Sequence, residues 1–253
     1  MPECEYGARG TLALAVPQAN PVVEPELHAL VPEGVNVITT RLSGSRTDSR
    51  DRLVGYFTNL ETSLAAFDNA AISVAGYACT GSAYILGRAA EEEGLARLAE
   101  RLGYPIVSSS SAIAAALGHL GVRRIAMVAP YPAWLADLSV AFWQERGIAV
   151  AAHVAAPVDP SDTRSAYRFL SSHIPPLVRG LDLGDAELIL LSGTGMPTLR
   201  ILDALTGEFG LPVLSSNLCL AWEALRRIGH TDHLPLPLGP ASLRGPWLDR
   251  LTA

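Results

Sequence analysis

The chain has 253 residues, of which 49% are hydrophobic and 17% charged, and its formal net charge at pH 7 is −6. This composition is typical of a compact globular protein and excludes a disordered chain. The acidic charge, without any cluster of Lys or Arg, argues against a nucleic-acid surface. We find neither a secretory signal pattern nor an apolar run of about 18 residues, and therefore expect a cytoplasmic protein with no membrane partner.

The first half of the chain alternates apolar, strand-like runs with helical patterns. A polar segment at 43–51, rich in Ser, Arg and Asp, is the kind of loop in which lids occur. Four strands are predicted at 11–16, 35–42, 71–78 and 104–107. Helices are predicted at 21–30, 52–67, 88–102 and 112–120.

The second half repeats this alternation. Strands are predicted at 124–129, 148–155, 187–191 and 211–214. Helices are predicted at 134–146, 167–179, 198–209 and 218–228, the second of them interrupted by Pro175 and Pro176. The Pro- and Leu-rich residues 230–253 are expected to pack back across the body of the protein.

Three short landmarks recur in the same order at nearly one offset, which indicates an internal duplication. They are Val16-Pro17 and Ala129-Pro130, Cys79-Thr80-Gly81 and Gly193-Thr194-Gly195, and the segments 105–109 and 212–216. Alternating strands and helices form parallel sheets with crossover helices. We therefore predict an α/β fold of two pseudo-symmetric lobes, each a four-stranded parallel sheet flanked by helices. The predicted division is 1–118 and 119–225, with 226–253 packing back on the first lobe.

Cys79 lies at the carboxyl end of a predicted buried strand, immediately before the start of a helix. A helix start carries free N–H donors and partial positive charge, which bind carboxylates and lower the pKa of a thiol. Ligands in such folds bind at the carboxyl ends of strands, so Cys79 and Gly193 are expected to face each other across a cleft. The alternative is that Cys79 is a small buried hydrophobic residue.

Cysteine and histidine usage gives no sign of a metal site. The three cysteines, Cys4, Cys79 and Cys219, are an odd number and widely spaced, so they form neither a disulfide framework nor a zinc site. The histidines also lack ligand spacing. The segment Ser192 to Gly195 resembles a phosphate loop only superficially, because no Gly-Lys-Ser/Thr follows it.

Several segments resemble one enzyme family. Tyr77-Ala-Cys79 and Met196-Pro-Thr-Leu199 are similar to segments of maleate isomerases, and Pro17-Gln-Ala-Asn20 resembles their first-strand loop. Tyr131 matches a tyrosine used by both maleate isomerases and arylmalonate decarboxylase. Over residues 10–229 the chain resembles the aspartate/glutamate racemase superfamily, specifically its maleate isomerase and arylmalonate decarboxylase branch. The resemblance implies that Asn20 holds a substrate carboxylate and that Pro17 lies beside it.

The chain departs from that family at one position. The racemases and isomerases carry one cysteine in each lobe, whereas Gly193 stands at the second position here. Arylmalonate decarboxylase has a single cysteine in the second lobe and a glycine in the first. This chain has the reverse arrangement, with Cys79 in the first lobe and Gly193 in the second. With no proton-transfer group on the Gly193 face, racemisation by two bases is not expected.

We therefore expect decarboxylation of a substituted malonate through an enediolate that Cys79 protonates. The developing charge would be stabilised by Tyr131 and by the backbone of Thr80, Gly81, Thr194 and Gly195. The reaction requires neither a metal nor an organic cofactor. A small carboxylate or dicarboxylate is the expected partner, and the sequence leaves open whether the chain forms an oligomer.

Two other functions remain open. One is cis-trans isomerisation of maleate with Cys79 as nucleophile, and the other is carboxylate binding without catalysis. Leu42, Tyr56 and Met196 are further candidates for the pocket lining. The sequence also leaves open whether Cys219 reaches the cleft in place of the missing second cysteine.

Overall fold

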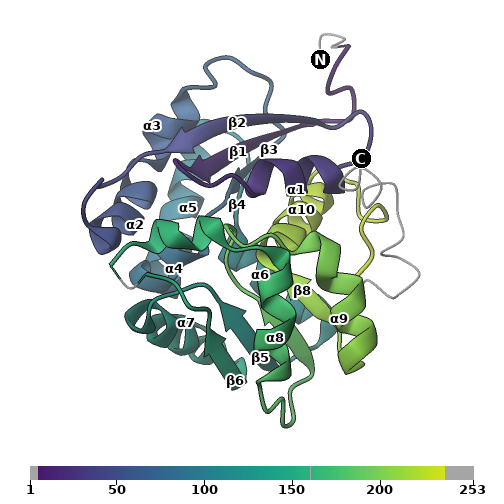
Figure 1. The fold of residues 1–253 in the computed structure, drawn as a ribbon. Helices are drawn as coiled ribbons and strands as arrows, with labels where there is room; N and C mark the ends of the chain where they lie inside the picture. Colours follow the sequence, from purple (N-terminus) through teal and green to yellow (C-terminus); the bar gives the residue numbers. More distant parts are fainter. Residues whose placement is uncertain (1–4, 160, 237–253) are drawn as a thin grey trace.

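The computed structural model describes residues 5–159 and 161–236 and contains two parallel sheets (Figure 1). The first sheet has the order β2-β1-β3-β4 and the second the order β6-β5-β7-β8. The strands of the first sheet are β1 (Thr11–Pro17), β2 (Asn36–Leu42), β3 (Val74–Tyr77) and β4 (Ile106–Ser108). Those of the second are β5 (Arg124–Ala129), β6 (Ala149–Ala155), β7 (Leu188–Leu191) and β8 (Val213–Ser215).

The two sheets share one topology, which confirms the predicted duplicated α/β fold. In the first sheet β1 pairs in parallel with both β2 and β3, so that Leu12 lies beside Val37 and Val74. In the second sheet β5 pairs in the same way with β6 and β7. The central strands are covered on both faces, and Leu12 to Val16 are fully buried. Such strands read as continuous apolar runs, which is why their positions were predictable.

Helices flank the first sheet. They are α1 (Val23–Leu30), α2 (Ser49–Thr58), α3 (Leu60–Ala65), α4 (Thr80–Leu86), α5 (Arg88–Leu102) and α6 (Ser109–Leu120). Polar side chains fix two of the starts: Asp48 accepts a hydrogen bond from the Asp51 N–H, and Ser108 forms a capping box with Ser111. The predicted helix at 52–67 is in fact two helices, broken at Asn59.

The helices of the second half differ more from the prediction. They are α7 (Ala133–Glu145), α8 (Ile174–Arg179), α9 (Leu202–Phe209) and α10 (Ser216–Arg227), with 3₁₀ turns η1 (Thr163–Arg168), η2 (Ser171–His173) and η3 (Leu199–Ile201). The predicted helix at 167–179 was wrong over its first half. Pro175 and Pro176 stand in the first turn of α8, where their missing N–H groups remove no helical hydrogen bond.

α10 joins the two halves, because it packs against α1 and α6 as well as against β8 (Figure 1). Beyond α10, His230 Nε2 lies 2.8 Å from the Arg9 carbonyl and His233 Nε2 lies 3.0 Å from the Leu30 carbonyl. The start of the expected C-terminal segment therefore contacts the first half, whereas 237–253 lie outside the described residues. No helix in the described part of the chain is both long and apolar enough to cross a membrane.

Candidate active site

A pocket of about 460 Å³ opens at the carboxyl ends of strands from both sheets. Pro17 ends β1, Cys79 follows β3, and Pro130 and Gly193 follow the equivalent strands β5 and β7. The lining residues are Pro17, Leu53, Tyr56, Cys79, Thr80, Gly81, Pro130, Tyr131, Leu135, Thr163, Ala166, Tyr167, Gly193, Thr194 and Gly195.

The pocket brings together all but one of the residues predicted for the site. Asn20 is the exception, because it is buried behind the pocket wall and is absent from the lining. Its Nδ2 donates to Thr194 Oγ1 at 3.2 Å, and its Oδ1 accepts from the Val22 N–H at 2.9 Å. In this structure the Asn20 side chain therefore bonds the lining residue Thr194 and the backbone of Val22.

Cys79 precedes the first turn of α4, and its side chain is only 5% exposed. Its sulfur lies 3.3 Å from Ser82 Oγ. Burial raises the pKa of the Cys79 thiol, outweighing the lowering by Ser82 and by the Gly81 N–H. Desolvation is therefore a larger effect on the Cys79 pKa than the lowering expected from the helix start.

A hydrogen bond of 2.5 Å between Thr80 Oγ1 and the Tyr131 hydroxyl crosses from one half to the other. Tyr131 is buried, and its ring packs edge-on against Tyr84 at 5.8 Å between centroids. Tyr84 in turn shares a hydrogen bond of 2.8 Å with Ser192 Oγ. These contacts fix the Tyr131 hydroxyl at the pocket, where it is a candidate donor to a substrate oxygen.

Gly193 occupies the position equivalent to Cys79 in the second half. Its φ of +134° favours glycine, and a Cβ there would lie 2.8 Å from Pro130 Cδ. Its N–H donates to Ser216 Oγ at 2.8 Å. The face of the pocket opposite the thiol therefore carries no side chain at this position.

The Thr194 side chain is held by the first half of the chain. Its hydroxyl donates to the Ala78 carbonyl at 2.9 Å and accepts from Asn20. Ala78 directly precedes Cys79, so this hydrogen bond fixes the second-half wall against the segment that carries the thiol.

Seven lining residues were absent from the predicted site. Tyr56 was only a candidate for the lining, and the other candidates, Leu42 and Met196, are buried outside it. Tyr167 packs so closely on Gly195 that a Cβ there would lie 2.5 Å from the ring. The other five that were missed are Leu53, Pro130, Leu135, Thr163 and Ala166. A periodic pattern identifies such side chains as apolar but does not separate pocket from core.

Ion pairing fixes η1 beside the pocket. Arg52 of α2 is 1% exposed and donates to Asp162 Oδ1 at 2.9 Å and to Thr163 Oγ1 at 3.2 Å. Ser49 adds a contact, since its Oγ donates to the Ser161 carbonyl. The polar segment predicted at 43–51 thus contains the start of α2. Through Ser49 it contacts residues 161–163.

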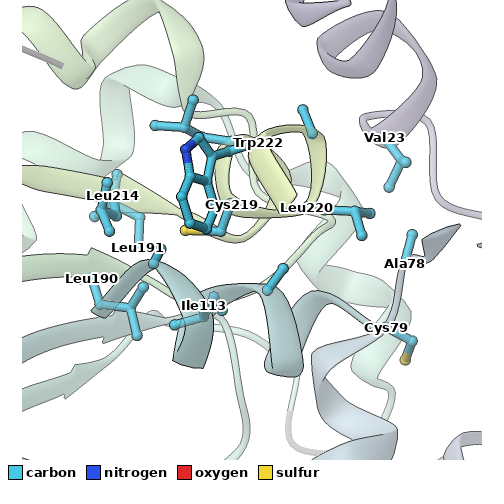
Figure 2. Packing of buried hydrophobic residues seen from close by; sticks show 14 of the residues in the cluster. Val23, Ala78, Cys79, Ile113, Leu190, Leu191, Leu214, Cys219, Leu220 and Trp222 are labelled. Atoms are coloured by element: carbon cyan, nitrogen blue, oxygen red, sulfur yellow. The ribbon is translucent and has the colours of Figure 1, made fainter. Parts of the chain in front are cut away.

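Cys219 does not reach the pocket, so it cannot replace the missing second cysteine. It is fully buried, and Figure 2 shows its sulfur among Leu191, Ile113 and Trp222, well separated from Cys79. Burial raises its thiol pKa far above the ordinary value. Cys4 lies outside the described residues.

The pocket is suited to a carboxylate ligand that is bound by uncharged hydrogen-bond donors. None of the described lining residues is Lys, Arg or His, so carboxylate oxygens would be met by hydroxyl and backbone N–H groups. Within residues 5–159 and 161–236, no three His, Cys, Asp or Glu side chains gather as a metal site would require. The one strongly nucleophilic group in the lining is the Cys79 thiol.

Comparison with known proteins agrees with this geometry. The sequence model of the family described as arylmalonate decarboxylase matches residues 12–235. The maleate isomerase of Nocardia farcinica is 27% identical over 227 residues, covering 86% of this chain and 89% of that relative. The maleate isomerase of Geobacillus stearothermophilus is 24% identical over 237 residues, covering 88% and 94%.

Solved structures show the same fold. The Nocardia farcinica maleate cis-trans isomerase, as a cysteine-to-serine mutant with a covalently bound succinylcysteine intermediate, superposes with a TM-score of 0.78 at 25% identity. The match covers 87% of this chain and 92% of that one. A crystal structure of arylmalonate decarboxylase gives a TM-score of 0.72 at 22% identity, covering 87% and 92%.

Proposed function

Because the chain belongs to the arylmalonate decarboxylase family, we propose that it isomerises a small cis-unsaturated dicarboxylate of the maleate type, with Cys79 as nucleophile. The observation that carries the proposal is the Cys79 thiol at the wall of a pocket whose described lining has no basic side chain. The relatives named above are maleate isomerases that match over most of the chain. These relatives favour isomerisation over the decarboxylation expected from the sequence.

In the proposed reaction the thiol adds across the carbon–carbon double bond. Sulfur bonds to one carbon, and a proton reaches the neighbouring carbon, which leaves a single bond that can rotate. Removal of that proton and departure of sulfur then restore the double bond in the trans form. Atoms and electrons balance without an oxidant or reductant.

A solved relative supports a covalent step that uses one cysteine. The solved relative with a succinylcysteine intermediate is a mutant in which a cysteine has been replaced by serine, so its adduct formed with one cysteine fewer.

The carboxylates would be held by neutral donors. The backbone N–H groups of Thr80 and Gly81 open α4, where partial positive charge favours an anion. Thr194, Gly195 and the Tyr131 hydroxyl face the same cavity from the second half. Pro17 and the rings of Tyr56 and Tyr167 would shape the rest of the site.

Decarboxylation of a substituted malonate is the second candidate, and Gly193 favours it. With no side chain there, a single acid would protonate an enediolate from one face only, and a protonated Cys79 thiol is such an acid. Leu53 and Leu135 give the lining an apolar side that could contact a substituent.

The deciding experiment follows maleate and phenylmalonate separately by NMR in deuterated water. Fumarate formed without CO₂ supports isomerisation, whereas a deuterated monoacid with CO₂ supports decarboxylation instead. Cys79→Ala should abolish either reaction, and Cys219→Ala should leave it unchanged. Saturable maleate binding without turnover would contradict the proposal and favour a carboxylate-binding protein.

A further inference from the structure

Glu26 is a carboxylate buried outside the pocket, on the inner face of α1, with 4% of its surface exposed. Burial raises its pKa, and each hydrogen bond it accepts opposes that shift. A buried carboxylate is costly unless fully hydrogen-bonded, so its partners indicate its role.

Among the described residues, the hydrogen-bond donors to Glu26 all come from the second half of the chain. Oε1 accepts from the Thr198 N–H at 2.6 Å and from the Leu199 N–H at 3.0 Å. Oε2 accepts from Asn217 Nδ2 at 2.8 Å. A first-half residue therefore satisfies the free N–H groups where η3 begins, shortly after the segment 193–195 that lines the pocket.

Asn217 carries this contact on to the pocket. Its Nδ2 also donates to the Thr194 carbonyl at 3.1 Å, so the two hydrogens of one amide nitrogen serve Glu26 and Thr194. Asn217 is buried, and Thr194 lines the pocket. Because both acceptors need this NH₂ group, Glu26 favours the amide orientation in which Asn217 donates to the Thr194 carbonyl.

We propose that Glu26 is a positioning residue for the active site, which acts through Asn217 to hold the Thr194–Gly195 backbone in the geometry that receives the substrate. The inference deepens the proposed function and rests on it for its catalytic consequence. Its structural consequence, the fixed conformation of 193–199, does not depend on which reaction occurs.

The orientation of the Asn217 amide makes the proposed role of Glu26 testable. In Glu26→Gln, the Gln carbonyl can still accept from Thr198 and Leu199, but its NH₂ then faces the NH₂ of Asn217. Rotating the Asn217 amide relieves that clash and turns its carbonyl toward the Thr194 carbonyl, so the wall loses its donor. The double variant Glu26→Gln/Asn217→Asp restores the bond between residues 26 and 217, yet gives Thr194 no donor.

The experiment measures thermal unfolding, hydrogen exchange of peptides spanning 193–199, and kcat and KM for the substrate that the wild type turns over. Glu26→Gln should exchange faster in 193–199 and lose about 10²-fold in kcat/KM, the scale of a small misplacement of a reacting group. The double variant should recover its Tm while exchange stays fast and kcat/KM stays low. Glu223→Gln is the matched control, because Glu223 is a buried carboxylate whose partners are Arg226 and Arg227 of α10.

Unchanged exchange and kinetics in Glu26→Gln would overturn the proposal. Recovery of both Tm and kcat/KM in the double variant would also overturn the proposal. Glu26 would then only connect the two halves of the chain, without positioning Thr194 for the reaction. If Glu26→Gln does not fold, Asn217→Ala gives the same test, because it leaves the Thr198 and Leu199 bonds intact. If the wild type turns over neither acid, the proposed function fails, whereas the exchange measurement still tests the role of Glu26.

Discussion

Pro130 packs directly against Gly193, so that a Cβ at residue 193 would lie 2.8 Å from the proline Cδ. Together with the positive φ of Gly193, this contact disfavours a side chain at residue 193. The single-cysteine site is therefore built into the backbone of this chain. It is not the result of one missing sulfur alone.

Gly193→Cys should accordingly destabilise the protein and fail to increase turnover of maleate. A non-glycine residue in such a backbone conformation costs about 1–3 kcal/mol, and the contact with Pro130 adds to that. Gly193→Ala should show most of the same loss, which separates backbone strain from thiol chemistry. Denaturant unfolding and the rate of fumarate formation check both. A stable Gly193→Cys protein with faster turnover would show that the loop relaxes easily.

Tyr131→Phe should reduce kcat by about 10²-fold, as expected for loss of one donor to a developing negative charge. The variant keeps the ring against Tyr84 and removes only the hydroxyl that bonds Thr80. Tyr104→Phe is the control, since Tyr104 is half-buried and outside the pocket lining. A Tyr131→Phe enzyme with wild-type kcat would rule out a role for this hydroxyl in the reaction.

Much of the site was predictable because duplication and strand order determine it. Cys79 and Gly193 follow equivalent strands of two sheets with the same order, so they meet at one pocket once the carboxyl ends of the two sheets face each other, as they do here. Asn20 shows the limit of a local signal. A loop asparagine after a strand is equally able to bond a ligand or the protein, and here it bonds Thr194 and Val22.

The η1 residues were missed for a different reason. Helical spacing over 167–179 suggested a helix, but the chain adopts 3₁₀ turns up to His173, and Tyr167 lies on Gly195. The same segment is held by the ion pair of Arg52 with Asp162, two residues 110 positions apart in sequence. No local pattern encodes such a pair. The burial of Cys79, which raises its pKa, also depends on tertiary packing that a local pattern does not show.

Alkylation of Cys79 should be slow at neutral pH and rise through an apparent pKa above the ordinary value of about 8.5. Burial raises the pKa, so the reactive thiolate is a smaller fraction at any given pH than in a free thiol. Iodoacetamide modification followed by peptide mass spectrometry from pH 6 to 10 measures this, with Cys219 as the buried reference that should react more slowly still. A midpoint below 8 would mean that the helix start outweighs burial.

Asp162→Ala should raise KM several-fold and destabilise the protein, because Arg52 would be left buried without that carboxylate. We expect a loss of about 2 kcal/mol, less than the loss for a fully buried pair, since Asp162 is 33% exposed while Arg52 is 1% exposed. Loss of this contact should also release Thr163 and Tyr167 from the pocket, which is why KM should change. Arg164→Gln is the matched control, because it removes the more exposed partner of Asp162 and leaves Arg52 paired. If both variants had the same KM and Tm as the wild type, the Arg52–Asp162 pair would have no part in shaping the site.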